Sequence, residues 1–444
     1  LDPYAPMVYG RDWYAHPGNQ GQKIGVRTYN PYDYVVREWA PTQTHNISVN
    51  GRAGNTTYNM SVGYLDQSGM MKTAEHDDYR RWNASARINS KINQYLDLHA
   101  GLIYSRSQKR YAYATSSTSA DIWYYLYRWG PTFPLTTTDE NGNPLRNFTC
   151  ESAAANTATR TTNYTSANAG LTITPLKDWT IDLDYTFSNN EFVSFTPGTR
   201  FTGGDTWGAP VAKYNADGSR AQATNEWSQY NGMPATVDAF MLNCYQYTSN
   251  GSNPDHVYRS ASDAARSTLN LTSNYDLNIQ DTHHLHFLVG MNAVKYDYAY
   301  SWSQITNLID INNPQFTLAN GTQTSGGSES WESQLGFFGR VNFSLTDRYL
   351  LEANIRYDGS SKFPTNLQWR WYPSFSAAWR VMEEPWMEFA KQAVSALKLR
   401  ASWGSIGDQT VPSNLYVPTM SRSELAWVMS GAKLVYYGTL AAVS

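Results

Sequence analysis

Few side chains in this sequence have the types and spacing that catalysis or metal binding requires. Asp182 and Asp184 form a pair of carboxylates that could suggest hydrolysis, and His284 and His286 could ligate a metal from one strand face. No third ligand follows the histidines, so a solvated turn explains them more simply, and acids at alternate positions of a strand line one face. No phosphate-binding glycine loop or nucleophile elbow is present. The sequence therefore predicts no enzyme, no metal site and no cofactor.

Two further short features have structural explanations. The segment Asp139-Glu140-Asn141-Gly142-Asn143 lacks the spaced oxygen ligands and the distant Glu of a calcium loop, so we interpret it as a β-turn. Cys150 and Cys244 lack the neighbouring Cys or His of a zinc site, and the sequence leaves open whether they pair or stay free thiols.

The strongest candidate for ligand contact is an aromatic run within a long link between predicted strands. Exposed aromatic rings in such a link could stack on sugar rings or dock a partner protein. The alternative is a loop whose aromatic residues form its own small core. The candidate residues for substrate or partner contact are Trp123, Tyr124, Tyr125 and Trp129, with Trp207, Trp227, Tyr230 and Trp302 as secondary candidates.

Composition favours an all-β protein. The sequence has 33 Tyr and 16 Trp but only 16% charged residues, and it has no apolar run of the roughly 18 residues that a membrane helix needs. A formal net charge of -3 gives no cationic field for nucleic acid. Leu1 follows no signal segment and the last residues carry no end motif, so we expect both ends to be cuts in a longer chain.

Strands are predicted from strict alternation of apolar and polar residues. In 81–89, Trp82 and Ile88 share the apolar face, whereas Arg81 and Arg87 share the polar face. A tight turn leads into a second strand at 96–104, and the same hairpin plan recurs along the chain. A short helix around 384–390 joins the last pair. In total we predict about twelve strands, the other pairs lying within 47–64, 169–188, 269–291, 337–357 and 375–403.

The connections between these strands alternate in length. Each tight turn is followed by a long link, as in 108–162, 193–262 and 303–330. Short turns at one end and long loops at the other are typical of an outer-membrane β-barrel, whose outward face meets lipid. A soluble β-sandwich or propeller is the alternative. The residues expected to face the lumen are Arg81, Arg87, Asp97, Asp182, Asp184, Arg340, Glu352, Arg356, Lys398 and Arg400.

Several motifs resemble those of SusC/RagA-like TonB-dependent transporters, in that family's order and spacing. The resemblance covers most of the chain from His45 to Gln409. The motifs are Asn46-Ile47-Ser48-Val49-Asn50-Gly51, Tyr58-Asn59-Met60-Ser61-Val62-Gly63-Tyr64-Leu65-Asp66-Gln67-Ser68-Gly69, Asp347-Arg348-Tyr349-Leu350-Leu351, Arg356-Tyr357-Asp358-Gly359-Ser360-Ser361-Lys362-Phe363, Pro373-Ser374, Trp379-Arg380, Glu383-Glu384, and Leu397-Lys398-Leu399-Arg400 through Gly404 to Gln409.

This resemblance implies a transmembrane antiparallel β-barrel of roughly 22 strands around a plug, of which residues 1–444 would form about half. No plug and no TonB-contacting box are recognisable in the sequence, so energy coupling rests on the resemblance. Members import a bulky nutrient across the outer membrane, typically an oligosaccharide and in some branches a peptide. They act with a SusD-like surface lipoprotein and are energised through the TonB complex. A passive porin and a soluble carbohydrate-binding or hydrolytic β-protein remain the alternatives.

Overall fold

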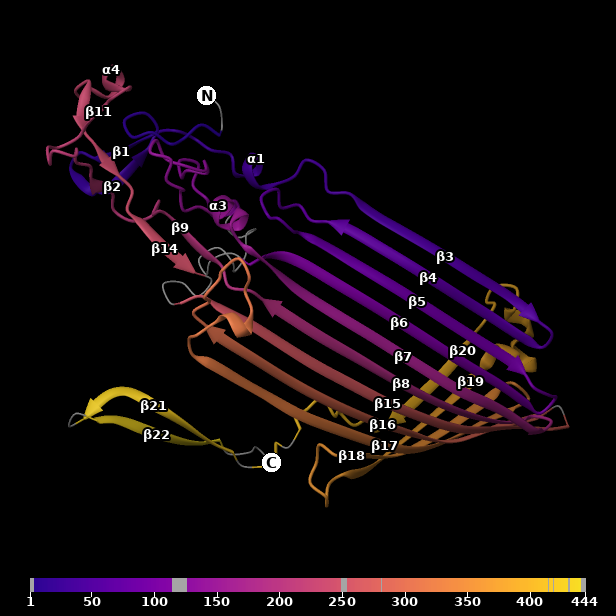
Figure 1. Cartoon of the computed structure of the whole chain (residues 1–444). Coiled ribbons are helices and arrows are strands. Elements are labelled where there is room, and N and C mark those ends of the chain that lie inside the picture. Colours follow the sequence, from indigo (N-terminus) through magenta and orange to yellow (C-terminus); the bar gives the residue numbers. More distant parts are fainter. Residues whose placement is uncertain are drawn as a thin grey trace.

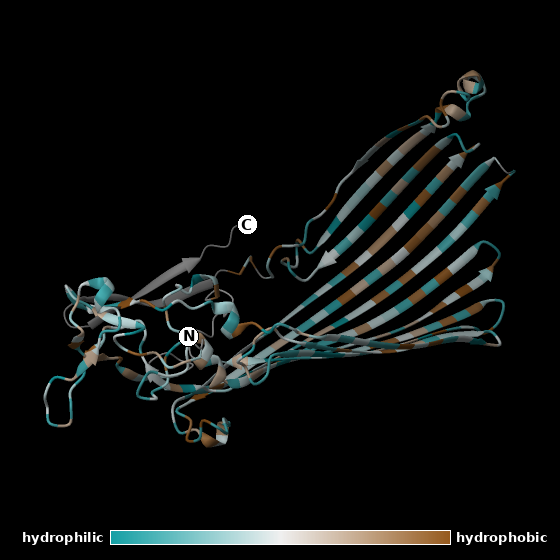
Figure 2. Cartoon of the chain, turned by 90° about the horizontal axis from the view of Figure 1, so that it is seen from above, coloured by the Kyte–Doolittle hydropathy of each residue, from teal (hydrophilic) through white to brown (hydrophobic). Residues whose placement is uncertain are grey.

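Twelve antiparallel strands form one curved sheet in the computed structural model (Figures 1 and 2). The structure describes residues 4–113, 126–248, 254–280, 282–413, 415–417, 419–429 and 432–440. The predicted number of strands is confirmed. In chain order the strands are β3 (Thr42–Ala53), β4 (Thr56–Ser68), β5 (Asp78–Lys91), β6 (Leu96–Tyr113), β7 (Asn156–Leu176), β8 (Trp179–Thr196), β15 (His256–Ile279), β16 (His283–Thr306), β17 (Gln323–Leu345), β18 (Tyr349–Ser360), β19 (Trp369–Arg380) and β20 (Lys398–Gly404).

Each strand of this sheet pairs with the sheet strand that precedes it and the one that follows it in the chain. The largest insertion separates β8 from β15, yet these two strands still pair directly, with Leu183 opposite Leu271. β3 and β20 form the two edges, and neither has a second partner strand among the described residues. The sheet is therefore an open, curved wall and not a closed barrel.

Tight turns join the strands at one end of the sheet. Gly54, Asp178 and Gln280 have φ angles of 59°, 66° and 54°, and Thr346 and Asp347 have φ angles of 51° and 54°. Positive φ is the backbone conformation that short β-hairpin loops require. The predicted hairpins between β3 and β4, β7 and β8, β15 and β16, and β17 and β18 are thereby confirmed.

The link between β19 and β20 contains the predicted helical segment, as the 3-10 helices η2 (Val381–Glu383) and η3 (Pro385–Ala390). Glu384 fixes this link to the sheet. Its carboxylate accepts hydrogen bonds from the Tyr349 hydroxyl at 2.6 Å and the Trp379 indole N–H at 2.9 Å. These bonds, that from Tyr349 first, lower the pKa of Glu384.

The strands extend further toward the opposite end than the sequence predicted. β15 and β16 each have 24 residues, and their pairing continues to His256 opposite Thr306. The predicted link boundaries at 108–162, 193–262 and 303–330 were therefore too wide. Apolar alternation marks only the part of a strand that meets lipid, whereas backbone pairing continues through polar residues beyond it.

The long links contain small elements of their own, which the sequence did not predict. After the last strand of the large sheet, a separate two-stranded sheet is formed by β21 (Thr419–Met429) and β22 (Ala432–Leu440). The elements before β3 and in the links are β1 (Trp13–His16), β2 (Asn19–Gly25), α1 (Pro31–Val35), α3 (Phe148–Ala153), β9 (Arg200–Gly204), β10 (Val211–Ala212), β11 (Gln222–Thr224), α4 (Ser228–Asn231), β12 (Thr236–Asp238), β13 (Phe240–Met241), β14 (Cys244–Thr248) and η1 (Phe316–Leu318).

The strand register aligns apolar residues in rows across one face of the sheet. One row runs without interruption from β6 to β19 and places apolar side chains side by side on eight strands. Figure 2 shows the matching alternation of hydrophobic and hydrophilic residues along each strand. The residues of this row are Leu98, Leu171, Leu183, Leu271, Met291, Phe337, Tyr357 and Trp371.

This apolar face is exposed. Ile47 is 73% exposed and Val289 60%, values that are costly in water but normal for side chains that face lipid. The structure describes no helix that is long and apolar enough to cross a membrane.

Candidate functional site

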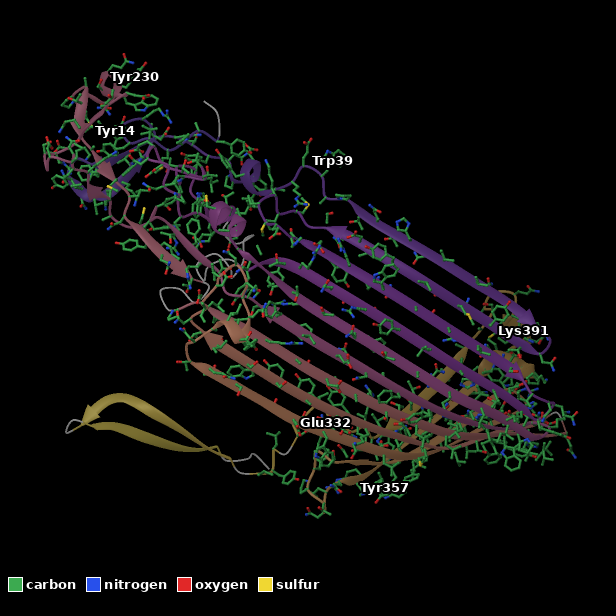
Figure 3. The ribbon with its side chains drawn as sticks, in the orientation of Figure 1. Tyr14, Trp39, Tyr230, Glu332, Tyr357 and Lys391 are labelled. Atoms are coloured by element: carbon green, nitrogen blue, oxygen red, sulfur yellow. The ribbon has the colours of Figure 1, made fainter. Side chains whose placement is uncertain are left out.

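At the end of the sheet opposite the tight turns, the segment before β3 and two of the long links fold together (Figure 1). We call this the loop assembly and define it as residues 4–41, 126–155 and 197–248. Apart from Val381 and Met382 in the opposite turn, the buried hydrophobic residues of the described chain lie in loops or at the loop ends of strands. In Figure 3, Tyr14 and Tyr230 lie in this assembly, far from Lys391 in the η3 turn. Apart from that turn, the buried cores of the described chain thus lie at the loop end of the sheet.

The first core joins the segment before β3 to two of the links. Leu145 is fully buried and packs with Trp13 and Phe240. Its backbone bridges to Gly204, and Met7 bridges to Asp139. Segments far apart in the sequence are therefore held together by both apolar packing and backbone contacts.

The second core contains Trp129, one of the four residues predicted to contact a ligand or partner. Its ring meets Phe148 edge-on at 4.9 Å and Trp207 at 5.6 Å, and its indole N–H donates to the Phe133 carbonyl at 3.1 Å. Only 6% of Trp129 is exposed. Its predicted surface role is thereby corrected, because the ring packs inside the loop. The other candidates, Trp123, Tyr124 and Tyr125, lie outside the described residues.

The secondary aromatic candidates are placed differently from one another. Trp207 is 55% exposed and stacks on Phe133 at 4.6 Å, at the edge of the second core. Trp227 and Tyr230 lie together at α4, with ring centroids 5.9 Å apart and Tyr230 75% exposed. Trp302 stacks on Tyr258 at 6.0 Å at the loop end of β16. Several aromatic rings are thus presented at this end of the sheet.

Buried ion pairs stabilise the loop assembly, one between β9 and the residue before β15 and one within the link before β7. Asp255 is 1% exposed, accepts a hydrogen bond from Arg200 at 2.6 Å and another from the Leu308 backbone N–H at 2.8 Å. Glu151 is equally buried and pairs with Arg146 at 3.1 Å. A buried charge is tolerated only when it is paired and hydrogen-bonded, so these contacts hold the links in one arrangement.

The segment 139–143 and the two cysteines have structural roles in the loop assembly. Asp139 caps the turn, since its carboxylate accepts hydrogen bonds from the Asn141 and Asn143 backbone N–H groups at 2.8 and 2.9 Å. The predicted β-turn is confirmed. Cys150 and Cys244 are free thiols. Burial raises the pKa of the Cys150 thiol to about 12, which makes it a poor nucleophile.

The polar face of the sheet carries paired charges and amides. His99 and Asp184 approach within 2.5 Å across Gly170, where an added Cβ would meet both side chains. Asp182 accepts a hydrogen bond from Thr172 at 2.6 Å. The two acids that could have suggested hydrolysis therefore have partners on a strand wall.

A hollow of about 400 Å³ lies on this face near the tight turns. His284, His286, Glu352, Lys398 and Arg400 contribute to its lining, so the two histidines share a face as expected. His286 pairs with Asp276 at 2.7 Å. Within the described residues, no group of three or more His, Cys, Asp or Glu side chains is placed to hold a metal ion. The site is thus a polar wall beneath an aromatic-rich mouth.

The chain is similar to known proteins of one family. A family model described as TonB dependent receptor-like, beta-barrel matches residues 124–427. The chain is 24% identical to "TonB-dependent receptor SusC" of Bacteroides thetaiotaomicron, covering 93% of this chain and 39% of that protein. It is 24% identical to "TonB-dependent receptor P26" of Formosa agariphila, covering 86% of this chain and 35% of that protein.

A solved structure shares the fold. The RagAB peptide transporter matches with a TM-score of 0.64 and 16% identity, covering 94% of this chain and 42% of the matched chain. The chain thus spans about two-fifths of the length of the relatives it matches. The predicted half-barrel of a larger outer-membrane barrel is confirmed. The polar wall and the lipid-facing rows agree with these matches. The chain belongs to the TonB-dependent receptor-like β-barrel family, as a SusC/RagA-like outer-membrane protein.

Proposed function

We propose that the complete protein actively imports a bulky nutrient, an oligosaccharide, across the outer membrane. The observation that carries this proposal is the large, packed loop assembly above a polar wall in a chain of this transporter family. A passive pore has no need of links that bury two hydrophobic cores and several ion pairs. A peptide is the second candidate, because the structurally similar RagAB is a peptide transporter.

We further propose that residues 1–444 act as a single β-barrel unit, completed by other parts of a longer protein. The loop segments support this, since they pack on one another at the ends of the sheet strands. TonB and a SusD-like surface lipoprotein are the proposed partners, inferred from SusC and the RagAB assembly. Exposed rings such as Trp207 and Tyr230 offer apolar surface on the side where such a lipoprotein would sit.

Trp123, Tyr124 and Tyr125 remain our proposed contacts for substrate or partner. They precede Trp129 in the same link, and Trp129 is anchored in the second core. We propose that Trp129 acts by packing in the second core, and that Trp123, Tyr124 and Tyr125 of the same link make the contacts. Three aromatic contacts at about 0.5 to 1.5 kcal/mol each correspond to a change in affinity of roughly tenfold or more.

The test is uptake of a fluorescently labelled oligosaccharide mixture by cells that carry the complete protein as the sole transporter of its kind. We expect uptake to stop when a protonophore collapses the proton gradient. We expect the triple variant W123A/Y124A/Y125A to reduce uptake at low substrate concentration about tenfold or more. The matched control is Y214A, which removes an exposed ring at another place in the loop assembly that is not among the candidate contacts.

Each outcome has a distinct meaning. Uptake that persists without the gradient would indicate a passive porin, and uptake of labelled peptides alone would select the second candidate. A triple variant that assembles and imports at the wild-type rate would contradict the role of the three aromatic residues. Should the triple variant not assemble, the three single variants replace it in the same assay.

A further inference from the structure

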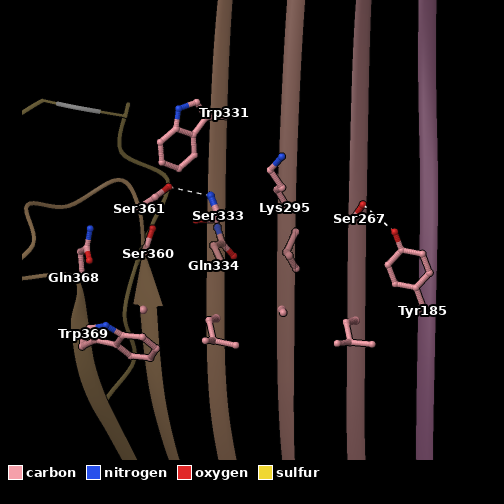
Figure 4. Close-up of a pocket in the computed structure, with 15 residues that line it drawn as sticks. Tyr185, Ser267, Lys295, Trp331, Ser333, Gln334, Ser360, Ser361, Gln368 and Trp369 are labelled. Carbon is pink, nitrogen blue, oxygen red and sulfur yellow. Dashed lines mark hydrogen bonds between the residues drawn. The ribbon is translucent and has the colours of Figure 1, made fainter.

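A groove of about 500 Å³ crosses the apolar face of the sheet near its loop end (Figure 4). It runs over β15, β16, β17 and β18, between Tyr185 on β8 and Trp369 on β19. Its volume lies within the range of about 300 to 1,000 Å³ that is usual for ligand pockets. Its lining is mostly apolar, and nothing described in the chain covers it.

Small residues beside Leu335 form the floor of this groove, and aromatic rings form its walls. Ala293 on β16 and Gly359 on β18 lie on either side of Leu335 on β17, and Ser333 is the next residue of β17 on the same face. Gly359 is required here, because a Cβ at this position would lie 2.8 Å from the Trp369 ring. On the other side the Tyr185 hydroxyl donates to Ser267 at 3.2 Å, which holds that ring beside the floor. The groove is therefore built by the choice of residues and not by a gap between strands.

The groove lies where the apolar belt ends. On β16 the belt residues run at alternate positions from Leu285 to Ala293, and the next two residues on this face are Lys295 and Asp297. At about 3.4 Å per residue and a tilt of about 40°, the belt spans about 20 Å of membrane thickness, close to the apolar band of outer-membrane barrels. The groove therefore opens at the level of the outer-leaflet headgroups.

A cation lies at the rim of the groove at this level. The Lys295 side chain is 62% exposed and its ammonium group is 2.8 Å from the Asp297 carboxylate. An ammonium has three donors, so Lys295 can contact a phosphate while it stays next to Asp297. Trp331, 62% exposed, stands at the same rim, and such rings are typical of the membrane interface.

We propose that this groove binds an anionic lipid of the outer leaflet, with an acyl chain over the small-residue floor and a phosphate at Lys295. The strands beneath it are internal strands, each paired on both sides, so closure of the barrel leaves the groove open to the membrane. The groove lies on the apolar, lipid-facing side of the sheet, so a polar nutrient passing through the lumen cannot occupy it. The proposal is independent of the imported substrate.

The test uses the complete protein, purified in mild detergent and mixed with lipid A, a phosphorylated outer-leaflet glycolipid, or with zwitterionic phosphatidylcholine. Native mass spectrometry measures the lipid that is retained. We expect retention of lipid A over phosphatidylcholine. K295Q should weaken this retention at least about fivefold, because that is the contribution of one basic side chain to binding at an anionic membrane surface. A293W, which fills the floor with an apolar ring, should abolish it for both lipids.

Matched controls lie on the same face outside the groove. R106Q removes an outward cation on β6, and A353W adds a ring at an apolar position on β18, and both should retain lipid A as the wild type does. Equal retention by wild type and K295Q, or equal loss in R106Q, would overturn the proposal. If the groove variants change the number of protein copies in the complex instead, a second copy of the chain occupies the groove. If A293W does not fold, the retention of lipid A by K295Q compared with R106Q tests the proposal.

Discussion

Replacing Leu183 by Arg should destabilise the barrel by about 2 to 4 kcal/mol, whereas Arg at the neighbouring Asp182 should cost much less. Leu183 lies between Leu171 and Leu271 in the long apolar row, so an Arg there would put a charge near the middle of the bilayer. Asp182 lies on the opposite face, where Arg loses the hydrogen bond from Thr172 but stays in polar surroundings.

Urea titration of the complete protein in lipid vesicles measures both changes, with the barrel's mobility shift on unheated gels as the signal for folding. The pair L183R and D182R is its own control, because the two positions are adjacent and on the same strand. Equal losses of stability in the two variants would show that the faces of β8 have been misassigned.

Replacing Phe148 by Ala should unfold the loop assembly while the sheet stays folded. Phe148 is fully buried and its ring packs on Trp129, and such a truncation costs about 3 to 5 kcal/mol. α3 would keep its cap, since Asn147 still accepts a hydrogen bond from the Cys150 backbone N–H. The sheet should be unaffected because its strands are held by the backbone ladder and by lipid.

Protease treatment of intact cells measures this effect. We expect F148A to be cleaved in the loop assembly at least tenfold faster than the wild type, with an unchanged mobility shift of the barrel. Y230A is the control, since Tyr230 is largely exposed and its loss should leave cleavage as it was. Wild-type resistance of F148A would mean that the second core does not hold the loops together.

The twelve sheet strands were predictable because lipid on one face and water on the other impose strict alternation on each strand. Trp82, Ile88, Leu98 and Leu183 all fall on the face where the sequence placed them. The tight turns were predictable for the same reason, since alternation stops at them. Membership of the family followed from motifs that lie mostly within these strands and turns.

The loop assembly was not predictable, because its order comes from contacts between distant segments. Leu145, Trp13 and Phe240 meet in one core although no local pattern connects them. Trp129 illustrates the consequence, since an aromatic run within a link gives no indication of which ring packs inward. Short strands such as β10 and β13 are too brief for any periodicity to show.

Spin labels placed singly at positions 285–292 of the complete protein test whether β16 crosses a membrane with one face toward lipid. We expect high collision rates with oxygen, which concentrates in lipid, at Leu285, Phe287, Val289 and Met291. We expect low rates at the four intervening positions, whose side chains face the lumen. Equal rates at all eight positions, or the opposite phase, would contradict it.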